Sequence, residues 1–110
     1  MKVLKMKAWG DFDTPYHVNV AAGDDDKIQK ACDILNEFCK TLHGCDQDVE
    51  LKKYLEKRDD RNKLQYLLIG DDVFSPMQAV ALVNEIQHLC DTNCAYIYGN
   101  MFMCEQMIQI

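Results

Sequence analysis

Carboxylates follow three apolar stretches of this sequence, and each stretch ends in a glycine. The three segments are Ala8-Trp9-Gly10-Asp11, Ala21-Ala22-Gly23-Asp24 and Leu68-Ile69-Gly70-Asp71. If the stretches are neighbouring strands, these aspartates gather along one rim of a sheet, and ligands bind at the carboxyl ends of parallel strands. Carboxylate oxygens are the ligands that Mg²⁺ and Ca²⁺ prefer. Asp11, Asp24 and Asp71 are therefore the candidate metal ligands.

The same aspartates also fit a structural role. Asp24 to Asp26 precede a helical pattern, where carboxylates cap the first turn and interact favourably with the helix dipole. Asp11 and Asp71 fall in turn-like segments, where aspartate bonds to nearby backbone amides. No calcium-binding loop spacing is present, so we favour the structural role over the metal site.

Two groups of side chains combine thiols with an imidazole, the donor types of a zinc site. They are Cys39, His43 and Cys45, and His88, Cys90 and Cys94. Neither spacing matches a standard zinc knuckle, so zinc is the less favoured cofactor. The sequence predicts no cofactor for the main function.

Six cysteines in 110 residues would predict disulfides in a secreted protein. The first seven residues instead alternate lysines with apolar side chains, which is typical of a strand and unlike a secretory signal. We therefore expect a cytoplasmic protein with reduced thiols. Cys32 and Cys39, seven apart on one helical face, fit buried small hydrophobes.

Charge and motifs exclude several function classes. The net charge of −6 makes nucleic acid an unfavoured partner, and no apolar run approaches the ~20 residues of a membrane span. The chain also lacks a glycine-rich phosphate loop, a nucleophile elbow and a zinc-protease motif. These absences argue against the common enzyme classes.

Hydrophobic periodicity predicts the elements that would position these residues. Strands are expected at about 2–9, 16–20, 64–69, 95–98 and 101–110, and main helices at 24–44 and 75–89 with a shorter one near 48–58. The nearly continuous apolar run 64–69 predicts a central strand covered on both faces. Ser75-Pro76 predicts a capped helix start, and Gly99-Asn100 predicts a hairpin between the last two strands.

This order, ββα(α)βαββ, predicts a single domain over residues 1–110. Strand–helix–strand crossovers are right-handed, so both main helices should cover one face of the sheet. The expected fold is α+β, a two-layer α/β sandwich with a mixed five-stranded sheet.

The uncovered face of that sheet is the candidate binding surface, because it mixes aromatic, thioether and polar side chains. Its expected residues are His17, Asn19, Tyr96, Tyr98, Met101 and Met103. The apolar last strand, ending in Met107-Ile108-Gln109-Ile110, invites pairing with a second copy. We therefore expect a homo-oligomer, formed through the strand edge or the open face.

The expected function is a small cytoplasmic, non-enzymatic binding or regulatory protein that holds a protein or small-molecule partner. Compact acidic proteins of this size are common among inhibitors and adaptors, including those of phages and mobile elements. The alternative is a metal-dependent hydrolase acting on a phosphate ester at the aspartate rim.

Overall fold

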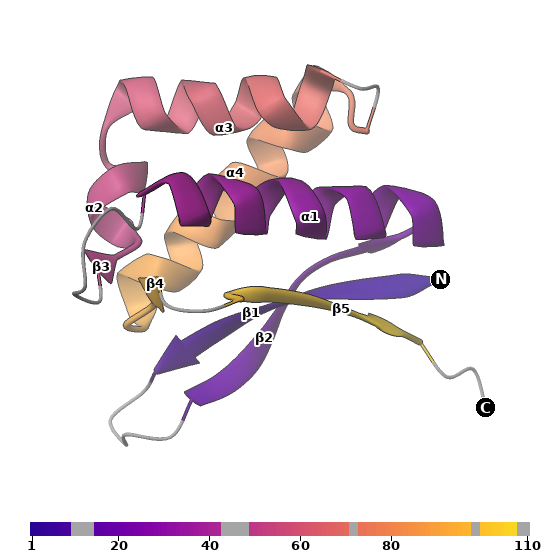
Figure 1. Cartoon of the computed structure of the whole chain (residues 1–110), viewed down its shortest axis with the longest axis horizontal. Coiled ribbons are helices and arrows are strands. Elements are labelled where there is room, and N and C mark those ends of the chain that lie inside the picture. Colours follow the sequence, from indigo (N-terminus) through magenta and orange to yellow (C-terminus); the bar gives the residue numbers. More distant parts are fainter. Residues whose placement is uncertain (10–14, 43–48, 71–72, 98–99, 108–110) are drawn as a thin grey trace.

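The computed structural model describes residues 1–9, 15–42, 49–70, 73–97 and 100–107. The elements found in them are β1 (Lys2–Trp9), β2 (Pro15–Gly23), α1 (Asp25–Leu42), β3 (Val49–Glu50), α2 (Lys52–Leu55), α3 (Arg58–Gly70), α4 (Pro76–Thr92), β4 (Tyr96–Ile97) and β5 (Phe102–Gln106). Strands β2, β1 and β5 form an antiparallel sheet in that order, and β3 pairs with β4 (Figure 1). The mixed α+β class is confirmed, whereas the described residues form no five-stranded sheet.

The central strand β1 follows the predicted alternation. Leu4, Met6 and Ala8 are fully buried, while Lys5 and Lys7 point to the opposite face and stay partly exposed. Alternate side chains of a strand lie on opposite faces, so one side of the sheet joins the core. Figure 1 shows α1, α3 and α4 all on that side, and the other side is not covered by a helix.

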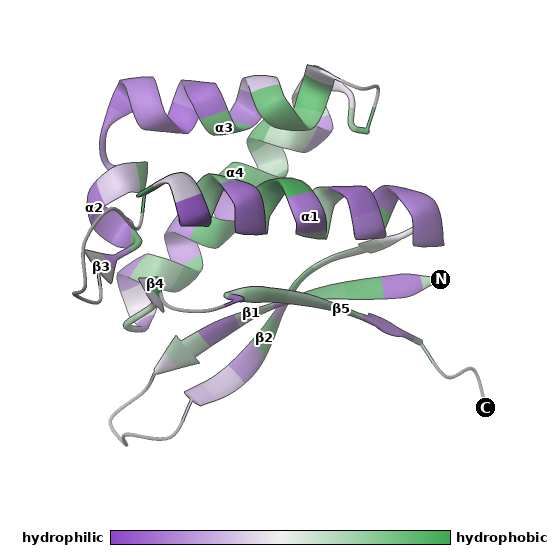
Figure 2. Cartoon of the chain, viewed as in Figure 1, coloured by the Kyte–Doolittle hydropathy of each residue, from purple (hydrophilic) through white to green (hydrophobic). Residues whose placement is uncertain are grey.

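The prediction of a central strand at 64–69 is wrong, because this segment is the second half of α3. Leu64 and Leu68, four residues apart, are buried, whereas Tyr66 is 75% and Leu67 is 43% exposed. A spacing of four places two side chains on one face of a helix. Figure 2 shows the reason for the error: the N-terminal half of α3 is hydrophilic and its C-terminal half hydrophobic. A short apolar run does not by itself distinguish a strand from a helix.

The two predicted main helices are confirmed. Helix α1 buries the apolar stripe expected from its periodicity, Ile28, Ala31, Cys32, Leu35, Phe38 and Cys39. Helix α4 begins with the predicted capping box, in which the Ser75 hydroxyl accepts from the Gln78 N–H and the Gln78 side chain accepts from the Ser75 N–H. It extends to Thr92, three residues beyond the expected end.

Gly99 of the predicted Gly99-Asn100 hairpin lies outside the described residues, but the strands on either side do not pair with each other as that hairpin requires. Strand β4 pairs with β3, whereas β5 pairs with β1. Strand β5 ends at Gln106, and residues 108–110 of the predicted last strand lie outside the described residues.

The edge of β5 nearest α1 is closed by a side chain. Asn36 of α1 donates to the Phe102 carbonyl and accepts from the Phe102 N–H, both at 2.9 Å. Phe102 is 2% exposed, so its outward backbone groups have little access to water. The amide of Asn36 replaces the strand that would otherwise satisfy them.

Candidate functional site

The open side of the sheet brings three of the predicted binding residues together. On β1, Lys5 pairs with Asn19 and Lys7 pairs with His17, both from β2, while Met103 of β5 stands opposite Lys5. Partner residues in a sheet share a face, so these five side chains form one surface. His17 and Asn19 are exposed, and the other three are partly exposed. We call these five residues the open face.

Electrostatics on the open face are set by one ion pair and by the ammonium group of Lys7. Lys5 Nζ lies 2.7 Å from Glu105 Oε2. Hydrogen bonding to Lys5 and its charge hold the pKa of Glu105 below its ordinary value, with a smaller contribution from His17. None of the ion pairs found among the described residues involves Lys7. The open face therefore carries a local positive bias on a chain whose net charge is −6.

The remaining predicted binding residues do not join the open face. Tyr96 belongs to β4 in the second sheet, where its ring meets Trp9 edge-on with centroids 6.1 Å apart. Met101 is fully buried, and its carbonyl accepts from the Lys7 N–H at 2.9 Å. Its placement on the exposed surface was wrong, because the residue enters the core just before β5 begins. Tyr98 lies outside the described residues.

Of the three candidate metal ligands, only Asp24 lies within the described residues, and Asp11 and Asp71 lie outside them. Asp24 is exposed and precedes α1, where its carbonyl accepts from the Ile28 N–H at 3.0 Å. This is the position of a residue that begins a helix.

The strand ends that were expected to share one rim lie far apart. Because β1 and β2 are antiparallel, Trp9 pairs with Pro15 and Gly23 pairs with Lys2. The carboxyl ends of the two strands are therefore at opposite ends of the ribbon, about 20 Å apart for strands of this length. Gly70 ends a helix and not a strand. Among the described residues, β1, β2 and α3 therefore do not provide the parallel strands on which the aspartate rim depended.

The two thiol–imidazole groups are only partly described. His43 and Cys45 lie outside the described residues, His88 and Cys94 are exposed, and Cys90 is buried. Over the ranges that the structure describes, no group of three or more histidine, cysteine or acidic side chains is arranged to hold a metal ion.

Three thiols are held in their protonated form by burial. Desolvation raises the pKa of Cys32 to about 11 and those of Cys39 and Cys90 to about 12. The thiolate is the nucleophile, so protonated thiols of this kind are inert at neutral pH. Their part in the structure is to fill the core.

We expect alkylation to distinguish these thiols from Cys94. In the native protein at about pH 8, iodoacetamide should modify the exposed Cys94 before the buried Cys32, Cys39 and Cys90. Peptide mapping by mass spectrometry after short exposures gives the order. Early modification of Cys39 or Cys90 would contradict the burial of these thiols.

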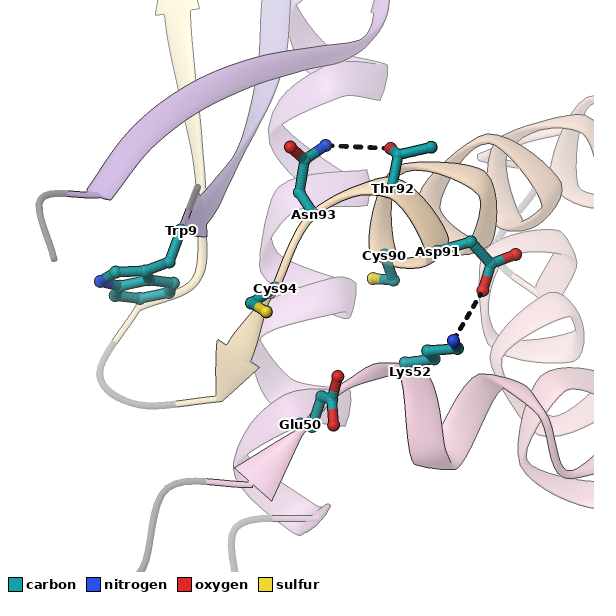
Figure 3. A pocket seen from close by; sticks show the side chains of 8 residues that line it. All are labelled: Trp9, Glu50, Lys52, Cys90, Asp91, Thr92, Asn93 and Cys94. Carbon is teal, nitrogen blue, oxygen red and sulfur yellow. Dashed lines mark hydrogen bonds and ion pairs between the residues drawn. The ribbon is translucent and has the colours of Figure 1, made fainter. Parts of the chain in front are cut away.

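A cavity that no sequence pattern indicated lies at the C-terminal end of α4. Its volume is about 320 Å³, and it is lined by Trp9, Glu50, Lys52, Cys90, Asp91, Thr92, Asn93 and Cys94. In Figure 3 the Glu50 carboxylate and the Cys94 thiol lie between the Trp9 indole on one side and the Lys52–Asp91 ion pair on the other. The lining residues come from β1, β3, α2 and the end of α4, so no local motif could have indicated the site.

Comparison with known proteins gives no match, whether with family models, with curated proteins or with solved structures. Within the described residues, no helix is long and apolar enough to cross a membrane.

Proposed function

We propose that this protein is a non-catalytic binding protein that holds a protein partner on the open face. The observation that supports this most directly is the uncovered side of the sheet, where a thioether, an amide, an imidazole and two ammonium groups lie together. Interfaces combine apolar and polar groups in this way. The proposal keeps the cytoplasmic location expected from the N-terminal segment and the regulatory role expected from size and charge.

A protein fits the open face better than a small molecule does. Small ligands bind in concave pockets that bury most of their surface. The cavities found at α4, between α1 and α3, and between β2 and α4 include none of the five open-face residues. The positive charge of Lys7 favours a partner with an acidic surface.

Self-association is part of the proposal, and β2 is the edge that supports it. Strand β2 is at the margin of the sheet order β2-β1-β5, and within the described residues no strand pairs with its outer side. An exposed strand edge pairs readily with a second copy, whereas the opposite edge is closed at Phe102 by Asn36. Sedimentation velocity should show a dimer or larger assembly. A monomer at every concentration measured would contradict this part.

A comparison of charge-matched variants tests the partner site. The variant Lys7→Glu reverses the bias of the open face, and Lys30→Glu makes the same change of charge on the exposed side of α1. Each of the three proteins is used to capture a partner from source-cell extract. The proposal is supported if one protein is recovered with the wild type and with the α1 variant, while its amount falls about tenfold or more with the open-face variant. Equal recovery by all three folded proteins would overturn it.

A further inference from the structure

The cavity at the end of α4 has a rigid frame. The backbones of Trp9 and Cys94 form an antiparallel bridge, in which the Cys94 N–H donates to the Trp9 carbonyl at 3.0 Å. Glu50 pairs with Tyr96 across β3 and β4, and the Leu51 N–H donates to the Ala95 carbonyl at 2.9 Å. These bonds fix the backbone positions of Trp9 and Glu50 before any ligand arrives, which reduces the entropy lost on binding.

The charges around the cavity favour a cation. Two carboxylates, Glu50 and Asp91, line it together with one ammonium group, that of Lys52. Lys52 Nζ lies 3.7 Å from Asp91 Oδ1 and 3.9 Å from Glu56 Oε1, so the charge of this lysine is already compensated. None of the ion pairs found among the described residues involves Glu50.

Two further observations agree with a negative field in the cavity. Helix α4 ends here without a basic residue in its last turn, and the C-terminus of a helix carries partial negative charge. After desolvation, the charges of Asp91 and Glu50 are the next causes that raise the pKa of the buried Cys90 thiol, and Lys52 opposes them.

We propose that this cavity binds a guanidinium group, with Glu50 as its carboxylate partner and the Trp9 indole as the surface on which it stacks. Guanidinium has five N–H donors and no acceptor, and the Glu50 and Asp91 carboxylates supply acceptors on the cavity wall. Guanidinium is planar and more weakly hydrated than ammonium. It therefore loses less hydration free energy when it leaves water to stack on an aromatic face. The site does not depend on the proposed function of the open face.

The chain offers a direct probe, because Trp9 is its only tryptophan and lines the cavity. Titration with N-acetyl-arginine methylamide should change Trp9 fluorescence saturably. The citrulline analogue, of nearly the same shape but uncharged, should bind about tenfold more weakly or not at all. The arginine compound should also slow alkylation of Cys94, which lies in the same cavity and is exposed.

A matched pair of variants locates the binding. Glu50→Gln should weaken affinity for the arginine compound about tenfold or more, whereas Glu37→Gln, on the exposed side of α1, should leave it unchanged. Equal binding of arginine and citrulline compounds, equal binding of N-acetyl-lysine methylamide, or no change at about 10 mM ligand would overturn the proposal. The comparison of ligands on the wild type keeps the test decisive if Glu50→Gln fails to fold.

The same titration distinguishes the source of the guanidinium group. Free agmatine binding more tightly than the capped arginine would indicate a small free ligand. Capped arginine binding at least as tightly would indicate an arginine side chain of a polypeptide.

Discussion

Replacing Leu68 by alanine should lower the free energy of unfolding by about 2–5 kcal/mol, because the side chain is fully buried and its loss leaves a cavity. Leu67→Ala, one residue earlier, should cost less than about 1 kcal/mol, since Leu67 is 43% exposed. Urea denaturation followed by circular dichroism measures both values, and unchanged m-values would show that stability alone has changed.

This pair of variants tests the helical assignment of residues 64–69. A central strand covered on both faces would bury Leu67 and Leu68 alike, on opposite sides. Helix α3 buries one and exposes the other. Similar losses of unfolding free energy in the two variants would therefore contradict the helix and support the strand that the sequence predicted.

Replacing Asn36 by alanine should lower the free energy of unfolding by about 2 kcal/mol, the second large effect. The substitution removes both hydrogen bonds to the Phe102 backbone, and Phe102 is too deeply buried for water to replace them fully. Thermal and urea unfolding measure the loss.

The control for this prediction is Asn84→Ala, on the exposed side of α4. Alanine has the higher helix propensity, so this variant should be as stable as the wild type or slightly more stable. If Asn36→Ala behaves like Asn84→Ala, the amide of Asn36 does not support the edge of β5. A large loss in Asn36→Ala alone would confirm that it does.

Local patterns predicted the elements whose signals are complete within one segment. The alternation along β1, the stripe of α1 and the Ser75-Pro76 start of α4 each depend on side chains a few residues apart. Such patterns report which face of an element meets the core. The open face was predicted in part for the same reason, since His17 and Asn19 alternate with apolar residues of β2.

Errors arose wherever the outcome depended on distant segments. The apolar run in α3 is compatible with a strand or a helix, and its packing against α4 and α1 selects the helix. The aspartate rim required parallel neighbours, whereas β1 and β2 pair as an antiparallel ribbon. Met101 was predicted to lie on the surface because the residues next to it in the sequence do not indicate which strand it packs against.

The sequence by itself therefore determined the α+β class, the buried faces of β1, α1 and α4, and the polar character of the open face. These features follow from residue types at fixed local spacing, because the period of a helix or strand decides on which face of the element each side chain lies. Only the tertiary structure decided the pairing of the strands and the cavity that joins Trp9, Glu50 and Cys94. Contacts between segments 40 or more residues apart depend on which packing of the whole chain buries the most apolar surface while every backbone group keeps a hydrogen-bond partner. No single segment contains that information.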